Sequence, residues 1–292
     1  MKHRFLVVVE MLLSVALAGA FSGKAAAEVK LMAFNMRYNT QKDTGLTNWE
    51  VRKHAIKEMM LQVRPDVVGV NEARTSMRTD LLEMLPDYGM IEIKGTGSGK
   101  GANSVIIYNK NTVKLLKSGW YFHSPTPGEP SMCWNVTTKQ WRGTCWGLFK
   151  EKATGKKFYY FCTHLCLGIK PCDLEAKLNS SLLNLDMMQK IAGEDMPVFI
   201  VGDMNASYLE DDERRWGLQP YYYWMKDARE APITNRETTF NGFGKMEITP
   251  RHMLDYIFYR NADVLRFDNL NKPDWGVPYI SDHYPIMVTV NL

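Results

Sequence analysis

Carboxylates, amides and histidines stand beside apolar, strand-like runs at several widely separated points of the sequence. In chain order they are Asn35, Asn71-Glu72, Thr163-His164, Asp203 with Asn205, Asp255 and Ser281-Asp282-His283. Side chains alternate between the two faces of a strand, so polar residues at strand ends can converge at one edge of a sheet. Each motif alone is typical of an ordinary turn or strand end. Their combination and order predict one site assembled from distant parts of the chain.

The oxygen-bearing side chains in this set suit a hard divalent cation. Glu72 and Asp282 offer carboxylates and Asn35 offers an amide oxygen, which are ligand types that Mg²⁺ or Mn²⁺ prefers. A hard cation polarises a phosphoryl oxygen and neutralises the charge that develops when a phosphoester is cleaved. We therefore predict magnesium or manganese as the cofactor and these residues as its ligands.

The remaining residues supply a base and donors for a phosphate group. His283 beside Asp255 can take a proton from water at neutral pH, because the carboxylate fixes the tautomer of the histidine. Asp203 and Asn205 are separated by one residue, so both can face one site across a short turn. We predict that Asp203 orients the nucleophile or handles its proton, and that Asn205 donates to the phosphate. His164 would donate to other phosphate oxygens or assist the leaving group.

Strands and a few helices must position these residues. Thr47-Asn48-Trp49-Glu50 resembles a capping box before a helix that continues to Val63, and Pro65 ends that helix. Two more helices are expected over residues 76–85 and 174–191. Strands are expected over residues 29–34, 66–70, 104–108, 157–163, 198–201, 254–259 and 284–290. Many strands, few long helices and mixed connections predict an α+β fold of two packed sheets with helices outside.

An aromatic stretch from Ser118 to Trp146 interrupts this pattern. It contains several prolines and tryptophans, and its middle is expected to be a long loop, of a length that is uncommon unless the loop serves binding. Trp134 in this loop is a candidate for stacking on a sugar, a base or another flat group of a substrate. Packing of such aromatics between loop and sheet is the alternative interpretation.

The first 27 residues resemble a secretory signal peptide. Lys2 and Arg4 precede an apolar run that is short for a membrane span, and Ala25-Ala26-Ala27 offers a cleavage site. Cleavage there would leave one catalytic domain over residues 28–292, without stable membrane insertion, in a secreted or periplasmic location. The whole chain carries a net charge of +4. This small excess argues against a global electrostatic grip on a long polyanion, although a local patch stays open.

The chain has five cysteines. In an oxidising compartment, Cys133 with Cys145, and Cys166 with Cys172, would be local disulfide pairs. The odd number leaves at least one thiol free or paired between chains. Cys162 lies in a strand-like run and is expected to be a buried, inert thiol.

The motifs together resemble the endonuclease/exonuclease/phosphatase superfamily. They are Asn35-Met36-Arg37-Tyr38, Val70-Asn71-Glu72-Ala73, Thr163-His164-Leu165, Gly202-Asp203-Met204-Asn205, Leu254-Asp255-Tyr256 and Ser281-Asp282-His283-Tyr284-Pro285. The resemblance covers nearly all of residues 28–292. Trp49-Glu50-x-Arg52 and Thr239-Phe240-Asn241-Gly242-Phe243 look closest to a secreted bacterial branch whose substrates are poorly defined. The departures are Asn71, Met204, Cys166, and Ala102 or Asn103, where relatives carry other residues.

This resemblance implies a four-layer α/β/β/α sandwich, with two mixed sheets flanked by helices and the site at one end. It implies a divalent ion on Glu72 with Asn35 and Asp282 close by, water activated by His283, and orientation by Asp255. Arg142 aligns loosely with an arginine that holds phosphate bidentately. Arg142, Asn241 and Trp134 are the expected substrate-binding residues.

These observations predict a monomeric, metal-dependent hydrolase. It would cleave a small organic phosphate, as a phosphodiesterase or a phosphatase, by in-line attack of an activated water. One alternative is a secreted nuclease that acts on DNA or RNA through a local basic surface. Another is a catalytically silent carbohydrate- or lipid-binding protein on the same scaffold, which the complete set of acid, base and metal ligands disfavours.

Overall fold

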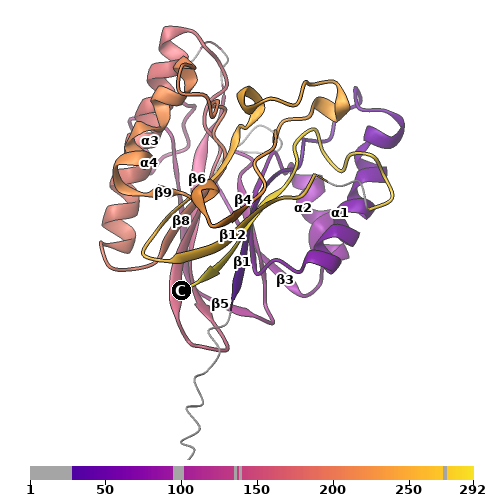
Figure 1. The fold of residues 1–292 in the computed structure, drawn as a ribbon, viewed down its shortest axis with the longest axis horizontal. Helices are drawn as coiled ribbons and strands as arrows, with labels where there is room; N and C mark the ends of the chain where they lie inside the picture. Colours follow the sequence, from indigo (N-terminus) through magenta and orange to yellow (C-terminus); the bar gives the residue numbers. More distant parts are fainter. Residues whose placement is uncertain (1–27, 95–101, 135–136, 138–139, 272–274) are drawn as a thin grey trace, which may run out of the picture.

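Apolar runs of the chain pair into two β-sheets that lie face to face between two layers of helices (Figure 1). The computed structural model describes residues 28–94, 102–134, 137, 140–271 and 275–292. The helices α1 and α2 cover the outer face of one sheet, and α3 and α4 cover the other. The expected α+β fold, a four-layer α/β/β/α sandwich with two mixed sheets, is confirmed. The predicted leader over residues 1–27 lies outside the described residues.

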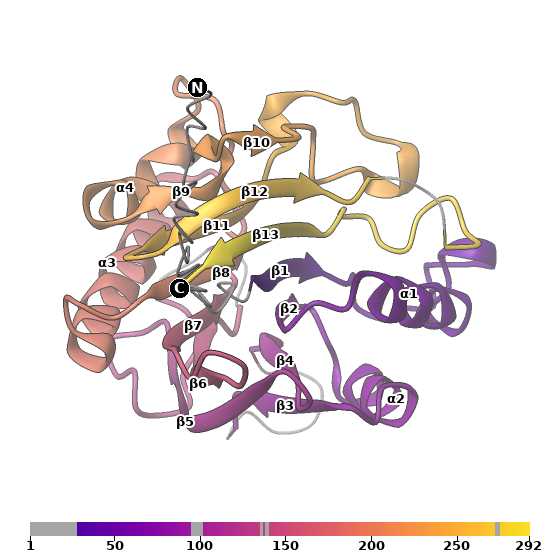
Figure 2. The same cartoon turned by 60° about the horizontal axis from the view of Figure 1, so that its bottom comes forward.

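The first sheet has seven strands in the order β10-β12-β13-β1-β2-β4-β3. Its strands are β1 Val29–Asn35, β2 Val67–Asn71, β3 Tyr88–Glu92, β4 Val105–Asn109, β10 Ile233–Thr234, β12 Asp263–Asn269 and β13 Ile286–Asn291. At its middle, β1 runs parallel to β2 and antiparallel to β13 (Figure 2). The parallel pair brings Asn35 level with Asn71.

The second sheet has six strands in the order β5-β6-β7-β8-β11-β9. Its strands are β5 Val113–Phe122, β6 Gly143–Glu151, β7 Lys157–Thr163, β8 Val198–Asp203, β9 Lys226–Asp227 and β11 Asp255–Arg260. The strand β7 is parallel to β8, whereas β8 and β11 are antiparallel and pair Asp203 with Asp255. Both sheets therefore end their site-bearing strands at the same rim, opposite the C terminus in Figure 1.

The α-helices are α1 Trp49–Val63, α2 Thr75–Met84, α3 Pro171–Ala192 and α4 Gln219–Trp224. Short 3₁₀ turns are η1 Gly45–Thr47, η2 Glu213–Leu218, η3 Ala228–Glu230, η4 Gly242–Gly244 and η5 Pro250–His252. The capping box predicted at Thr47 is wrong by one residue. Asn48 is the N-cap of α1, and its side chain accepts a hydrogen bond from the amide of Glu50. Arg64, in a left-handed conformation, ends α1 immediately before Pro65.

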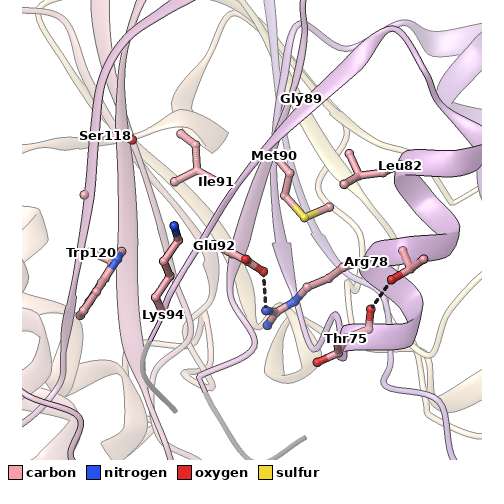
Figure 3. A pocket seen from close by; sticks show the side chains of 12 residues that line it. Thr75, Arg78, Leu82, Gly89, Met90, Ile91, Glu92, Lys94, Ser118 and Trp120 are labelled. Atoms are coloured by element: carbon pink, nitrogen blue, oxygen red, sulfur yellow. Dashed lines mark hydrogen bonds and ion pairs between the residues drawn. The ribbon is translucent and has the colours of Figure 1, made fainter. Parts of the chain in front are cut away.

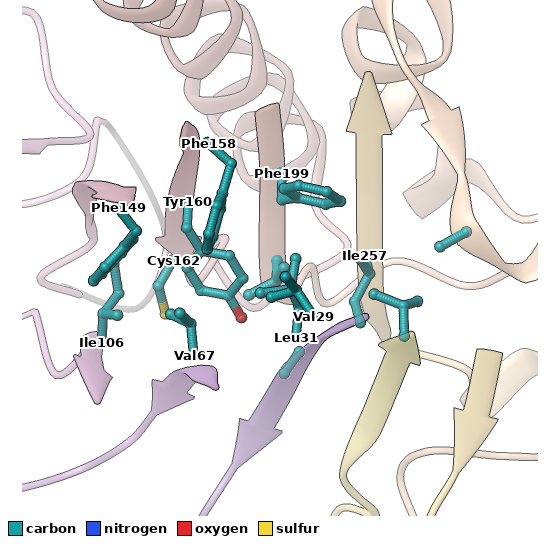
Figure 4. Close-up of a cluster of buried hydrophobic side chains, with 14 of the residues drawn as sticks. Val29, Leu31, Val67, Ile106, Phe149, Phe158, Tyr160, Cys162, Phe199 and Ile257 are labelled. Carbon is teal, nitrogen blue, oxygen red and sulfur yellow. The ribbon is translucent and has the colours of Figure 1, made fainter. Parts of the chain in front are cut away.

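The central core lies between the two sheets (Figure 4). Alternation along β1 turns Leu31 toward the other sheet and Met32 toward the helices, because successive strand residues face opposite sides. The sheets approach so closely at Gly69 that an added Cβ would meet Val201 at 2.4 Å. Beside it, the Tyr160 hydroxyl donates to the carbonyl of Met32 and accepts from the Gly69 amide. The two sheets are therefore in direct contact at the middle of β2.

The aromatic stretch is partly strand and partly loop. Trp120 lies on β5 and Trp146 on β6, where Trp146 packs against Tyr159 and Phe161 on the outer face of the sheet. The segment between these strands is the expected loop. The sequence did not predict β3, β5, β9, β10 or β12. The strand β12 was not predicted because a register irregularity between Val264 and Arg266 breaks the alternation of apolar and polar residues along it.

The local disulfide pairings are wrong. Cys145 lies opposite Cys162 on neighbouring strands, and Cys133 packs against Cys166 in a small cluster with Ala176. All five cysteines are free thiols in this structure. Cys162 is fully buried, as expected. Among the described residues, no helix is long and apolar enough to cross a membrane.

A buried arginine connects α1 to the rim. Arg52 is fully buried and donates to the carbonyls of Thr47, Met36, Arg37 and Ile280. Its guanidinium thus satisfies otherwise unpaired backbone groups in the turn after β1 and in the segment just before Ser281. This contact explains why an arginine stands in the Trp49-Glu50-x-Arg52 motif.

Replacing this arginine should destabilise the fold. Arg52→Met would leave buried carbonyls without donors, at a cost of roughly 2–5 kcal/mol in the free energy of unfolding. Urea unfolding measures this change. The matched control is Arg266→Met, whose exposed side chain pairs with Asp268 on β12 and should cost less than about 1 kcal/mol. Equal midpoints for the two variants would contradict the bridging function of Arg52.

Candidate active site

A buried histidine–carboxylate pair is the centre of the polar rim. The Nδ1 atom of His283 lies 2.7 Å from Oδ2 of Asp255, which is completely buried at the start of β11. The Nε2 atom of His283 faces Asp203, with 3.8 Å between Nε2 and Oδ2. Burial alone would lower the pKa of His283, but the charges of Asp255, Asp203 and Asp282 raise it to about 10. The carboxylates therefore hold a proton on this ring.

Asp203 connects the two sheets at the rim. Its Oδ2 accepts a hydrogen bond from Nδ2 of Asn35 at 2.9 Å, and its backbone amide donates to Oδ1 of Asn71 at 2.8 Å. Its Oδ1 accepts from the amide of Asn205 at 2.8 Å. Burial raises the pKa of Asp203 to about 6, and neighbouring Asp255 acts in the same direction. The departure from the family at Asn71 thus has a structural function, because this side chain orients Asp203.

His164 and Asn205 form the second half of the rim. Nδ2 of Asn205 lies 3.1 Å from Nε2 of His164 and also donates to the carbonyl of Leu165. An amide nitrogen can only donate, so Nε2 of His164 is the acceptor and Nδ1 carries the proton. Burial lowers the pKa of His164 well below its usual value, and the positive charge of Arg142 lowers it further. His164 is therefore a neutral ring, in contrast to His283.

Several site residues have strained backbones. Arg37, Glu72 and Asn205 have φ values of 53°, 65° and 47°, in the left-handed region that non-glycine residues rarely adopt. Such conformations cost of order 1–3 kcal/mol each and persist where surrounding contacts enforce them. Here the enforcing contacts are hydrogen bonds at the rim, such as that from the Tyr38 amide to Oε2 of Glu72.

Glu72 and Asp282 are the predicted carboxylate ligands of a divalent cation. Burial raises the pKa of Asp282, and the negative charge of nearby Glu72 raises it further. Two neighbouring carboxylates that repel each other gain most from a shared cation. Asn35 lies beside them, but its amide oxygen already accepts from the Arg37 amide and keeps one lone pair. Its function as a ligand stays a prediction.

A second group could also hold an ion. Ligand atoms of Asp203, Asp255 and His283 lie within 4.8 Å of one another, the one such group of three found among the described residues. However, Asp255 and His283 already face each other at hydrogen-bond distance, and Asp203 accepts bonds from Asn35 and Asn205. An ion there would compete with these bonds, although Oδ1 of Asp255 has no hydrogen-bond partner among the described residues. The position of the cation at Glu72 and Asp282 stays a prediction.

A cavity of about 670 Å³ opens beside the rim. Its lining consists of Tyr38, Glu72, Arg74, Asn103, Met132, Gln140, Trp141, Arg142, His164 and Leu167. Arg142 donates through Nε to the carbonyl of Leu165, which leaves the rest of its guanidinium toward the cavity. Arg74 lies over the ring of Tyr38, with 4.2 Å from the guanidinium carbon to the ring centre. The two arginines make this cavity attractive to an anion.

The structure does not bring all predicted binding residues to this cavity. Trp134 packs against Cys133, Cys166 and Ala176, whereas Trp141 lines the cavity in its place. Asn241 is buried and donates through Nδ2 to the carbonyl of Ser281, so it supports the rim from behind. Sequence reasoning did not single out Tyr38, Arg74 or Trp141 as cavity residues. The Asn35-Met36-Arg37-Tyr38 motif was the available signal for the first of them.

A larger cavity, of about 760 Å³, lies between α2 and the edge strands β3 and β5 (Figure 3). Arg78 and Glu92 form an ion pair at its wall with 3.0 Å between Nη1 and Oε2. Trp120 and Lys94 also line it. It contains none of the histidines or aspartates of the rim. Cavity size alone therefore does not identify the candidate site. The smaller cavity is the candidate because Glu72, Arg142 and His164 line it.

The stacked sheets and this rim of acidic, amide and histidine side chains define a two-sheet α+β protein with a hydrolase-type site. A model of the Endonuclease/Exonuclease/phosphatase family matches residues 184–283, from the middle of α3 to His283. This match and the fold shared with solved structures of the same name both support a place for the chain in the endonuclease/exonuclease/phosphatase superfamily.

Solved structures with the same fold span most of the chain. An endonuclease/exonuclease/phosphatase from Bacteroides vulgatus is 28% identical, with a TM-score of 0.75 over 91% of this chain and 99% of that one. A mannosyl-6-phosphatase from Bacteroides thetaiotaomicron is 25% identical, with a TM-score of 0.78 over 90% and 100%. TDP2 of D. rerio, complexed with single strand DNA product, is 20% identical, with a TM-score of 0.68 over 91% and 100%, and shows the fold alone. Sequence comparison with curated proteins finds no match.

Buried neutral histidines should make the fold acid-sensitive. His123 is fully buried, and its Nε2 lies 2.9 Å from Oγ1 of Thr144. Burial lowers its pKa from 6.5 to about 3, and Arg142 acts in the same direction. Between pH 6.5 and about pH 3, His123 therefore binds a proton in the unfolded chain but stays neutral in the folded chain. Stability should fall on acidification by about 1.4 kcal/mol per pH unit for each such histidine.

Urea unfolding between pH 7 and pH 4.5 measures this dependence. His123→Met removes one titrating group, while Thr144 keeps its bonds to Thr163 and Asn184. The slope of stability against pH should therefore decrease by about one proton. The matched control is His54→Met, on the exposed face of α1, which should leave the slope unchanged. The same slope in both variants would contradict a neutral, buried His123.

Proposed function

We propose that the protein is a divalent-metal-dependent phosphoester hydrolase that acts on a small organic phosphate by in-line attack of water. The observation that supports this most directly is the convergence of His283 with Asp255 and Asp203. Nδ1 of His283 lies 2.7 Å from Asp255, at the start of β11, and Nε2 lies 3.8 Å from Asp203, at the end of β8. A general base, an orienting carboxylate and hard cation ligands are the components that this reaction needs.

The chain's own residues would move the proton and orient the water. Asp255 accepts the Nδ1–H of His283, so Nε2 would be the atom that takes the proton of the water once bound positive charge lowers the pKa of this ring. Asp203, facing Nε2, aligns the water for attack in line with the leaving group. A divalent cation at Glu72 and Asp282 would supply positive charge that polarises the phosphoryl oxygen and offsets the carboxylate charge around His283.

Other residues would hold the phosphoryl oxygens. The free end of the Arg142 guanidinium can donate in a fork to two oxygens. The Nδ1–H of His164 provides another donor, and Asn205 fixes that ring through Nε2. Because these donors are held before substrate arrives, the site loses little energy to reorganisation during the reaction.

The cavity supports a phosphorylated sugar as the substrate. Its lining has two arginines for phosphate and the flat ring of Trp141, on which the face of a sugar can stack. The similarity to a mannosyl-6-phosphatase agrees with this chemistry. We also propose that the mature chain, residues 28–292, is exported, as the leader-like start of the sequence predicts, and that it acts as a monomer.

Removing the base or its partner should abolish turnover. His283→Ala and Asp203→Asn are each expected to lower kcat/KM by about 10²- to 10⁴-fold, because each removes a group that handles the proton or aligns the water. Rates on aryl and sugar phosphomonoesters and diesters, with Mg²⁺ or Mn²⁺, measure the effect.

His54→Ala, on the exposed face of α1, is the matched control and should keep full activity. Circular dichroism and the melting temperature would establish that each variant is folded. Wild-type activity in His283→Ala would overturn the assignment of the base. An inert wild-type protein across the whole panel, with plasmid and single-stranded DNA included at low salt, would overturn the proposed hydrolase.

The cation assignment has its own test. Glu72→Gln removes one negative ligand, so the metal concentration for half-maximal activity should rise about tenfold or more. Glu92→Gln, at the other cavity, is the matched control. If the ion instead bound at Asp203, Asp255 and His283, the metal requirement of Glu72→Gln would stay at the wild-type value, and metal binding by calorimetry would be lost in Asp203→Asn.

A further inference from the structure

Two cysteines that are far apart in the sequence meet behind the catalytic cavity. Cys133 belongs to the loop between β5 and β6, and Cys166 follows the strand β7 that carries His164. Both are buried, at 1% and 0% exposure, and they form a small cluster of their own with Ala176, against which Trp134 packs. This cluster is separate from the core between the sheets.

Both sulfur atoms lie against the same face of α3. Sγ of Cys166 is 3.3 Å from the carbonyl of Asp173, and Sγ of Cys133 is 3.9 Å from Oγ of Ser180. Asp173, Ala176 and Ser180 are spaced at three and four residues, so they form one stripe on the helix. The thiol of Cys133 also lowers the pKa of Cys166. The two cysteine side chains are therefore neighbours in one cluster against α3.

The residues next to both cysteines line the cavity. Met132 precedes Cys133, Leu167 follows Cys166, and both face the space that Arg142 and His164 share. The side chain of Gln140 also connects the two loops, since it accepts from the amide of Leu167 and donates to its carbonyl. A bond between the cysteines would hold this wall of the cavity in one shape.

We propose that Cys133 and Cys166 form a disulfide that cross-links the two loops of the cavity wall. The oxidant would be a dithiol oxidase or a small disulfide such as oxidised glutathione. The Cys166 thiolate attacks one glutathione sulfur, the glutathione S–S bond breaks, and one glutathione thiolate leaves. Cys133 then loses its proton to solvent and displaces the second glutathione, forming the new S–S bond. Two cysteine thiols lose two electrons, and one disulfide becomes two thiols.

The other three cysteines differ from this pair in burial and exposure, so they serve as controls for the oxidation experiment. Cys145 and Cys162 face each other across β6 and β7, but both are completely buried in the core between the two sheets. Cys172 lies in the first turn of α3 and is partly exposed. The loops that carry Cys133 and Cys166 reach the surface at Met132 and Leu167, which are 46% and 57% exposed. The proposed pair therefore lies one residue from an exposed side chain on each loop.

Peptide mapping tests the cross-link directly. The full chain is equilibrated with oxidised glutathione, alkylated, and digested without reductant before mass spectrometry. We expect a linked peptide that contains Cys133 and Cys166, with Cys145, Cys162 and Cys172 recovered as alkylated thiols. Recovery of Cys133 and Cys166 as alkylated thiols, or linked to other cysteines, would overturn the proposal. Neither result depends on enzymatic activity.

Stability provides an independent measurement. Reduction of the wild type should lower Tm by roughly 5–15 °C, because the cross-link restricts the unfolded chain. Cys172→Ser should show the same fall, whereas the double variant Cys133→Ser with Cys166→Ser should show none. A fall of equal size in the double variant would place the redox-sensitive group elsewhere and refute the pair. If the double variant fails to fold, Cys133→Ala alone replaces it.

The position of the cross-link also predicts an effect on substrate binding, which rests on the proposed function. Reduction should raise KM by roughly two- to tenfold, because the freed loops must be ordered when substrate binds. The kcat should stay within about twofold, since the cross-link changes neither His283 nor its contacts with Asp255 and Asp203. An unchanged KM in a protein with a mapped cross-link would refute the effect on the cavity wall, while an inactive protein would refute only the proposed hydrolase.

Discussion

The hydrogen bond from Asn35 to Asp203 joins the two sheets at the rim, and the rest of the site depends on it. Asn35 ends β1 of one sheet and Asp203 ends β8 of the other, and 2.9 Å separate their bonded atoms. Next to this bond, an added Cβ at Gly202 would lie 1.9 Å from the carbonyl of Thr163. Only a glycine allows β7 and β8 to approach so closely. The rigid sheets therefore hold His164 and Asp203 at one edge.

This arrangement costs stability, which the rest of the molecule offsets. Asp203 and Asp255 are buried with like charges, and Glu72 and Asn205 adopt left-handed backbones. Such features persist only where packing and hydrogen bonds enforce them. The tightly packed layer around Gly69 provides that support, since it lies on the strand that ends at Asn71 and Glu72. Because the polar groups of the site are held in place before substrate binds, they can stabilise the charge that develops on a phosphate without rearranging.

The central strands were predictable because they are buried on both faces. The runs that became β2 and β8 are continuously apolar, and no other element fits so short an apolar segment. Edge strands such as β3 and β5 are half exposed and have mixed sequences, so their pattern resembles a loop. The partner of each strand was not predictable, because pairing depends on residues that lie far away in the chain.

The sequence by itself determined which residue types are available and that they stand at strand ends. This was sufficient for the fold class and for candidates such as Asp203 and His283, because a strand end is a local property. Tertiary structure alone decided that Trp141 rather than Trp134 lines the cavity, and that Cys133 meets Cys166. Loop residues receive their neighbours from the packing of distant elements, and no local pattern encodes those contacts.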